Sequence, residues 1–321
     1  MNPLALPRAA LVACALLLMV PLILPDWIMF ILNKALFMFV GVLGVAVLLR
    51  GGLLTFGYAL FYATGAYTVG FSVKWFGVHE LLLVVPLGAL AGMIMAALVG
   101  LVMARYREVF FAMLNLAFSM ILFGALLKFY WVTGGTDGLA TGTATLLGIA
   151  LPPGSVGFYY FTLAVAGVVT FVAHRYMASP VGYFLRAMYD NEIRIEYSGV
   201  AVRQVVYRTF IFAGTLGGIS GVLAAFTIGH IVPEDAFWIQ SGEFVFMALL
   251  GGFGGLPGPL MGAIAFEFIA AYASKYFPLA WQMTLGIIML LIILFQPGGL
   301  WAIYKWVEDW FGQGARGGEH S

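Results

Sequence analysis

Apolar runs long enough to cross a lipid bilayer follow one another along almost the whole chain. The chain is 63% hydrophobic and only 9% charged, whereas soluble domains are about half apolar and a quarter charged. A membrane-spanning helix needs about 20 apolar residues, so we expect an all-α polytopic integral membrane protein with roughly ten spanning or partly spanning helices in a single domain, residues 1–321. The segments are residues 9–24, 27–49, 53–74, 81–104, 109–131, 157–177, 206–229, 237–250, 259–275 and 279–300.

Three of these segments, 53–74, 237–250 and 259–275, are short or are interrupted by glycine and proline. Such segments can be half-helices or re-entrant loops, which occur in membranes only where protein or water covers the backbone. Proline in a helix interior removes a backbone donor and clashes with the preceding turn. The residues predicted to break helices are Gly57, Gly65, Gly254, Gly255, Pro257 and Pro259.

Basic residues predict the orientation of the chain, because they collect in cytoplasmic loops. Arg105 and Arg107 lie in one short loop, and several arginines lie in another, residues 175–208. The loop between these two, residues 134–156, contains no Lys or Arg. The alternation predicts that both termini are cytoplasmic, including a short tail over residues 302–321.

The first apolar run, residues 9–24, follows Arg8 as the apolar part of a signal peptide would. It has no small-residue cleavage site, and another apolar run follows at once. We therefore expect a first transmembrane helix rather than a secretion signal.

The longest polar stretch, residues 178–208, lies between two apolar runs, and seven of the chain's 15 basic and 14 acidic residues fall within it. Arg186, Asp190 and Arg194 recur at intervals of four, which predicts one face of an amphipathic helix of about three turns. We call residues 178–208 the docking segment and interpret it as the binding surface for a cytoplasmic partner. The alternative is a solvated loop helix that only joins two spans. The candidate binding residues are Arg186, Asp190, Glu192, Arg194, Ser198 and Gly199, the last two also predicted to end the helix.

Three ionisable residues, Lys34, Glu243 and Glu267, lie inside or at the edge of apolar runs. Such residues are costly in lipid and are candidates for function. Lys34 is expected to extend its side chain to the outer interface, and Glu243 to lie near a helix N-terminus. Glu267 must face the bundle interior or water, and we expect it to be one partner of a buried pair rather than a substrate ligand. The candidate residues of a translocation pathway, chosen for polarity beside glycine breaks, are Thr55, Tyr58, Tyr62, Asp137 and Glu267.

Several motifs of enzymes are absent from the sequence. There is no HExxH, no GxSxG, no cluster of Cys and His, and only one cysteine. The nucleotide-binding pattern GxxxxGK[ST] is also absent. We therefore expect no catalytic residues, no metal and no cofactor in this chain.

Four motifs in order carry a resemblance to a known family. TFGYALFYATGAY (55–67) is similar to its "sFGhaaffgiGAY", and GGTDGL (134–139) to its "GGtnGl". VGYFLRAMYDNEIRIEYSGVAVRQVVYRTFIFAG (181–214) is similar to its coupling region, and GGFGGLPGPLMGA (251–263) and FQPGGL (295–300) to its closing motifs. The chain thus resembles the M-type permease subunits of bacterial branched-chain amino acid ABC importers. It departs from the pattern at Tyr58, where the family usually has His, and at residues 196–198.

The resemblance implies partners and a mechanism. A second, H-type permease would complete the pathway, two ATP-binding cassette subunits would dock on the docking segment, and a periplasmic binding protein would deliver substrate. The location would be the bacterial inner membrane, and the substrate a branched-chain or similar amino acid. Related permeases for urea, short amides or aromatic acids are alternatives.

Two other functional classes remain open from the residues. A self-sufficient secondary carrier or channel would need an intramembrane ion site, for which Lys34 and Glu267 are the candidates. A lipid-modifying membrane enzyme would need a nucleophile or a metal set, and the sequence offers neither.

Overall fold

A computed structural model of the chain describes residues 21, 25–252, 254–255, 257–295 and 298–302. The predicted first segment, residues 9–24, and the predicted tail beyond Ala302 lie outside these residues, except for Pro21. The described helices are α2 (Asp26–Leu49), α3 (Ala59–Phe76), α4 (Leu81–Met103), α5 (Glu108–Lys128), α6 (Tyr130–Thr133), α7 (Val156–Met177), α8 (Pro180–Asp190), α9 (Glu192–Tyr197), α10 (Val202–Ile228), α11 (Trp238–Gly251), α12 (Pro257–Tyr276) and α13 (Trp281–Phe295), with 3₁₀ turns η2 (Gly135–Asp137) and η3 (Pro233–Ala236).

Five of the described helices, α2, α4, α5, α7 and α10, are long and apolar enough to cross a membrane. They coincide with the predicted segments 27–49, 81–104, 109–131, 157–177 and 206–229, with ends that differ by at most a few residues. The predicted segment 279–300 contains helix α13 over Trp281–Phe295. The prediction of an all-α membrane fold is therefore confirmed in its broad form.

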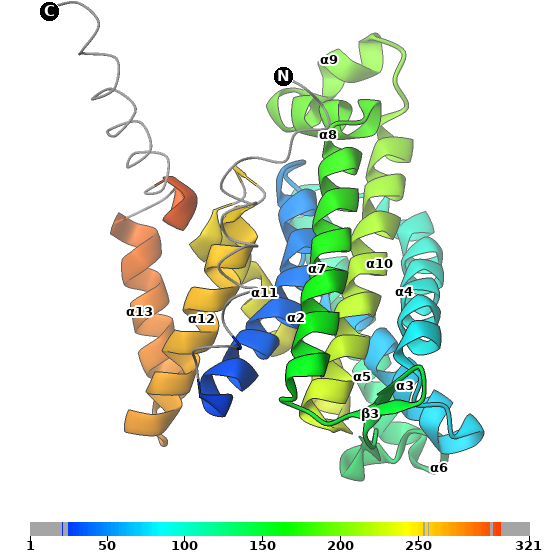
Figure 1. Cartoon of the computed structure of the whole chain (residues 1–321). Coiled ribbons are helices and arrows are strands. Elements are labelled where there is room, and N and C mark those ends of the chain that lie inside the picture. Colours follow the sequence, from blue (N-terminus) through cyan, green and yellow to red (C-terminus); the bar gives the residue numbers. More distant parts are fainter. Residues whose placement is uncertain (1–20, 22–24, 253, 256, 296–297, 303–321) are drawn as a thin grey trace, which may run out of the picture.

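The helices form a bundle with two distinct ends. In Figure 1, α8 and α9 lie at one end, which we call the charged end, and α6 and β3 lie at the opposite end. Arg50 and Arg186 line one cavity at the charged end, and Arg107 binds Glu192 there. Basic residues from three separate loops thus meet at one end, as the predicted alternation requires.

Helices α2 and α10 form the centre of the bundle, and most of their residues are buried. Helix α10 packs against α2, α3 and α4. Glycines let these backbones approach closely: a Cβ at Gly92 would lie 2.5 Å from the carbonyl oxygen of Gly214. Close contact between small residues is how helices associate in membranes, where lipid removes most of the hydrophobic driving force.

The opposite end is closed by short strands. β1 (Leu139–Ala140) pairs with β4 (His230–Ile231), and β2 (Ala144–Leu146) pairs with β3 (Ile149–Leu151), both antiparallel. The β2–β3 hairpin is fixed to the start of α4 because Glu80 accepts hydrogen bonds from the Leu147 backbone N–H and the Thr145 hydroxyl.

Two of the three doubtful segments contain short helices. The predicted segment 53–74 begins with six residues outside any helix, Leu53 to Tyr58, before α3 starts at Ala59. Helix α11 has 14 residues, which at 1.5 Å per residue gives about 21 Å, less than the bilayer core of about 30 Å. Helix α12 has 20 residues and is long enough to span.

Candidate docking surface and interrupted segments

The docking segment presents aromatic, apolar and charged side chains to solvent at the charged end. Tyr183, Tyr189, Ile193 and Tyr197 are exposed, the last by 89%. The opposite faces of α8 and α9 carry the buried residues Leu185, Met188 and Ile195, so both helices are amphipathic. Tyrosine and arginine together are the side chains that most often dominate protein–protein contacts. Of the six predicted binding residues, Glu192 is half-buried and the others, Arg186, Asp190, Arg194, Ser198 and Gly199, are exposed.

The predicted single helix through Arg186, Asp190 and Arg194 is wrong. Helix α8 ends at Asp190, and Asn191 is extended with φ −162° and ψ 101°. The Asn191 side chain accepts a hydrogen bond from the Arg194 backbone N–H at 2.9 Å and so caps the new helix α9. Because the chain turns between them, Arg194 does not continue the face that carries Arg186 and Asp190. The predicted helix stop is confirmed, since α9 ends at Tyr197 and Gly199 has φ +82°.

Helix α8 lies directly on the turn that ends α2. A Cβ at Gly51 would lie 2.3 Å from the Leu185 side chain, and one at Gly52 would lie 3.1 Å from the Tyr189 ring. Gly52 also has φ +71°, a left-handed conformation that suits glycine. The chain that leaves this turn is the interrupted stretch Leu53 to Tyr58, so the docking segment is in contact with the residues that lead into the bundle.

The first interrupted segment, residues 53–58, passes through the protein interior. Thr55 is fully buried, and Asn115 of α5 donates a hydrogen bond from Nδ2 to its hydroxyl oxygen. A Cβ at Gly57 would lie 1.9 Å from the carbonyl oxygen of Asn115, so the two backbones touch. The Ala59 N–H, at the start of α3, donates to the hydroxyl of Ser241 in α11 at 2.9 Å. The Ser241 hydroxyl thus takes the place of a helical acceptor for one backbone N–H, and Asn115 holds the Thr55 side chain.

A second stretch outside any α-helix, residues 233–236, precedes α11, and we call it the second interrupted segment. The 3₁₀ turn Pro233–Ala236 packs against α3 and α5. The Ser119 hydroxyl, midway along α5, donates to the Ala236 carbonyl at 2.7 Å. Ser119 lies one turn after Asn115, and both are fully buried. One face of α5 therefore holds both interrupted segments.

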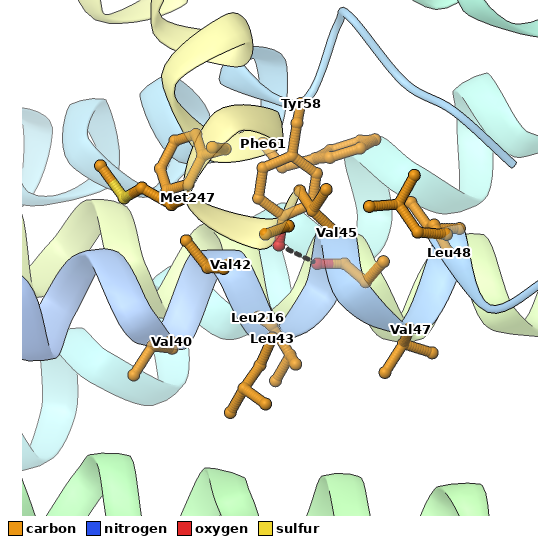
Figure 2. Packing of buried hydrophobic residues seen from close by; sticks show 14 of the residues in the cluster. Val40, Val42, Leu43, Val45, Val47, Leu48, Tyr58, Phe61, Leu216 and Met247 are labelled. Atoms are coloured by element: carbon orange, nitrogen blue, oxygen red, sulfur yellow. Dashed lines mark hydrogen bonds between the residues drawn. The ribbon is translucent and has the colours of Figure 1, made fainter. Parts of the chain in front are cut away.

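Tyr58 and Tyr62, two of the predicted pathway residues, are buried beside these segments. Figure 2 shows Tyr58 within one buried cluster that also contains Val42 and Val45 of α2 and Met247 of α11. The Tyr58 hydroxyl donates to the Ala213 carbonyl at 2.8 Å, and the rings of both tyrosines contact Phe244 edge to face. These contacts close the interior at this point, so a pathway through it requires the helices to move apart.

Glu267, a further predicted pathway residue, forms an ion pair with Lys34. Lys34 Nζ lies 3.1 Å from Glu267 Oε2 and joins α2 to α12. The expectation that Lys34 reaches the outer interface is therefore corrected: a carboxylate inside the bundle holds its ammonium group. Glu243 lies in the second turn of α11 rather than at its N-terminus, and Gln240 Nε2 donates to it at 3.2 Å.

Asp137, the remaining predicted pathway residue, lies apart from the others at the opposite end. It is exposed in η2, and the Tyr130 hydroxyl donates to its Oδ2 at 2.8 Å. The structure therefore brings together Thr55, Tyr58 and Tyr62 and separates them from Asp137.

The predicted helix breaks divide into three groups. Gly57 lies in the interrupted segment, and Gly254 and Gly255 lie in the turn between α11 and α12. Pro257 and Pro259 lie in the first turn of α12, where proline fits because its missing N–H has no helical acceptor. The break at Gly65 is wrong, because α3 continues through it. Its role is close packing: a Cβ there would lie 2.0 Å from the Gly218 carbonyl oxygen.

Several important polar residues were not among the sequence-based candidates. Asn115, Ser119 and Ser241 lie in apolar helices, where a hydroxyl or amide is a weak signal on its own. Arg107 was noted only for its charge. The ion-pair partner of Glu267 could have been proposed, because Lys34 carries the opposite charge within another apolar run. Among the described residues, no three His, Cys, Asp or Glu side chains are placed to hold a metal ion; that the chain takes no metal stays a prediction.

An all-α membrane protein with interrupted helices in its interior has the architecture of a transport permease. The family model described as the permease component of the branched-chain amino acid transport system matches residues 27–294. The chain belongs to this family of ABC transporter permeases, which are transport components rather than enzymes.

Named relatives come from bacteria and archaea. The chain is 26% identical over 272 residues to the high-affinity branched-chain amino acid transport system permease protein LivM of Escherichia coli, covering 78% of this chain and 64% of LivM. A probable LivM of Methanocaldococcus jannaschii is 26% identical over 238 residues, or 70% of this chain and 69% of that protein. LivH of Escherichia coli, also a permease, is 26% identical over 143 residues, or 43% of this chain and 46% of LivH. No solved structure matches the chain.

Proposed function

We propose that this chain is the membrane-spanning permease subunit of an ABC importer that moves branched-chain or similar amino acids across the bacterial inner membrane. Separate subunits hydrolyse the ATP. The observation that carries the proposal is the contact of α8 with the Gly51–Gly52 turn, because it joins an exposed docking surface to the first interrupted segment. The names of the LivM and LivH relatives support the substrate class.

The proposed assembly has a second, H-type permease, two ATP-binding cassette subunits and a periplasmic binding protein. The charged end faces the cytoplasm, which agrees with its arginines and the rule that basic loops stay inside. The ATPases bind the docking segment, in which the coupling residues are Arg186, Asp190, Glu192, Arg194, Ser198 and Gly199. Substrate passes between the permeases near Thr55, Tyr58 and Tyr62 when the interrupted segments shift.

The test reverses charge on the docking surface. In proteoliposomes that contain the chain with the products of its neighbouring genes, Arg186→Glu together with Arg194→Glu should lower ATP-driven uptake by about tenfold, because charges at an interface control partner binding. Gly199→Pro should have the same effect by altering the end of α9. Arg105→Glu, at an exposed position outside the docking segment, is the control and should leave uptake near the wild-type rate. Wild-type uptake by both the double charge-reversal variant and Gly199→Pro would contradict the proposal that the docking segment binds the ATPases.

A secondary carrier remains the rival, and the Lys34–Glu267 pair is what favours it. Uptake into liposomes without ATP, abolished by Glu267→Gln, would support the carrier. ATP-dependent uptake that survives Glu267→Gln would support the importer.

A further inference from the structure

Arg107 connects three helices at the charged end. Its Nε donates to both carboxylate oxygens of Glu192, at 3.0 and 3.2 Å, and Glu192 is the first residue of α9. Its Nη1 donates to the Ala104 carbonyl, at the end of α4, at 3.0 Å. Arg107 itself is the residue before α5. A single side chain thus fixes the start of α5 to the docking segment.

Two polar side chains near the middle of α5 form further hydrogen bonds to other parts of the chain. Asn115 and Ser119, two and three turns after Arg107, hold Thr55 and the Ala236 carbonyl. These links reach the first interrupted segment and the turn before α11. Helix α5 therefore contacts the docking segment at its start and both interrupted segments near its middle.

Helix α5 is less buried than the central helices α2 and α10. Its outer face is exposed in this chain, including Phe110, Met113 and Ile121. Glu108, its first residue, has φ +52°, a backbone conformation that residues other than glycine rarely adopt. The chain therefore bends sharply where α4 gives way to α5, which provides a pivot next to Arg107.

We propose that α5 is a lever that carries movement of the docking segment to the two interrupted segments, with Arg107 and Glu192 as the positioning residues that engage it. This inference rests on the proposed function, because it assumes that a partner moves the docking segment. A rigid element with linked contacts at two sites is how small shifts are passed through a packed protein.

The strength of the ion pair argues for a positioning role. The side chains of Arg107 and Glu192 are 24% and 34% exposed, and ion pairs in contact with water contribute little to stability. The pair can therefore be removed without unfolding the protein. What its loss would remove is the geometric link between α9 and α5.

The experiment is a charge exchange in the complete transporter, reconstituted in proteoliposomes with its ATPases and binding protein. The variants are Arg107→Glu, Glu192→Arg and the two combined. Each single variant should lower the number of substrate molecules transported per ATP hydrolysed by about fivefold, the lower end of measured coupling between sites. The combined variant should recover most of this ratio, because it restores an ion pair with its charges exchanged.

Arg105→Glu is the matched control, since Arg105 is exposed in the same loop, and it should leave the ratio unchanged. Thermal unfolding of every variant should stay close to wild type. An unchanged ratio in the single variants, or no recovery in the combined one, would overturn the lever. If no ATPase co-purifies with the wild-type chain, the proposed function fails instead, so the two failures are distinguishable.

Discussion

At Gly65 the backbone of α3 lies against the backbone of α10. A Cβ added there would lie 2.0 Å from the Gly218 carbonyl oxygen, whereas one added at Gly167 of α7 would meet nothing within 4 Å. The two glycines look alike in sequence, because each lies in an apolar helical run. Their surroundings give them opposite roles: close packing at one and no contact at the other.

Gly65→Ala should therefore lower the free energy of unfolding by about 1–3 kcal/mol, the usual cost of adding atoms to a packed interior. Gly167→Ala should leave stability unchanged or raise it by up to about 1 kcal/mol, because alanine favours a helix more than glycine does. Denaturant unfolding of the purified chain in detergent measures both. Equal stabilities for the two variants would contradict the packing at Gly65.

Glu80 makes the stability of the opposite end depend on pH. The backbone N–H of Leu147, helped by the Thr145 hydroxyl, holds the pKa of the Glu80 carboxyl below its usual value of 4.5. A lowered folded pKa means that the stabilisation is present above the unfolded pKa and is lost as pH falls through the folded pKa. The difference in melting temperature between wild type and Glu80→Gln should thus be full near neutral pH, begin to shrink as pH falls to about 4.5, and disappear only once pH is below the lowered folded pKa. A difference that is independent of pH would contradict this role.

Residue identity predicted some of these roles and missed others for physical reasons. The exposure of the charged residues in the docking segment was predictable, because charged residues concentrated in an apolar chain must contact water. The break at Asn191 was not, because it depends on a side chain that caps the next turn. The hydrogen bonds of Asn115 and Ser119 to two segments distant in sequence were not predictable either, since they depend on the tertiary arrangement of α5.

At the scale of elements, the ion pair between α2 and α12 is the clearest constraint on movement. Helix α2 is central and buried, while α12 belongs to the C-terminal part with α11 and α13 (Figure 1). Lys34 and Glu267 fix the two helices across this boundary. Glu267 is 3% exposed, so its charge depends on Lys34 for compensation.

Lys34→Met should destabilise the chain by about 3 kcal/mol, near the low end for breaking a buried pair, because the Lys34 side chain is 36% exposed. Lys34→Met combined with Glu267→Met should recover most of the loss, since no uncompensated charge remains. Thermal unfolding of the three proteins in detergent measures the effect. A double variant as unstable as the single one would show that the pair is not what holds α12 to α2.

Across the whole molecule, one end presents the charged docking segment and the interior contains two interrupted segments. α8 contacts the first of them through the Gly51–Gly52 turn, and α5 reaches both. The membrane class and the positions of the five long apolar helices were predictable from apolar length alone. The positions of α3, α11 and α12 were not, because glycine and proline allow several arrangements that only packing selects.

The central claim is that ATPase subunits bind the docking segment, and site-specific crosslinking tests it most directly. Cys14→Ser removes the only cysteine, and Tyr197→Cys then introduces one at a position that is 89% exposed in α9. Leu147→Cys, which is 79% exposed at the opposite end, is the control. With the chain expressed beside its neighbouring genes, position 197 should crosslink to an ATPase and position 147 should not. A chain that purifies without any ATPase or second permease, or that crosslinks equally from both positions, would contradict the claim.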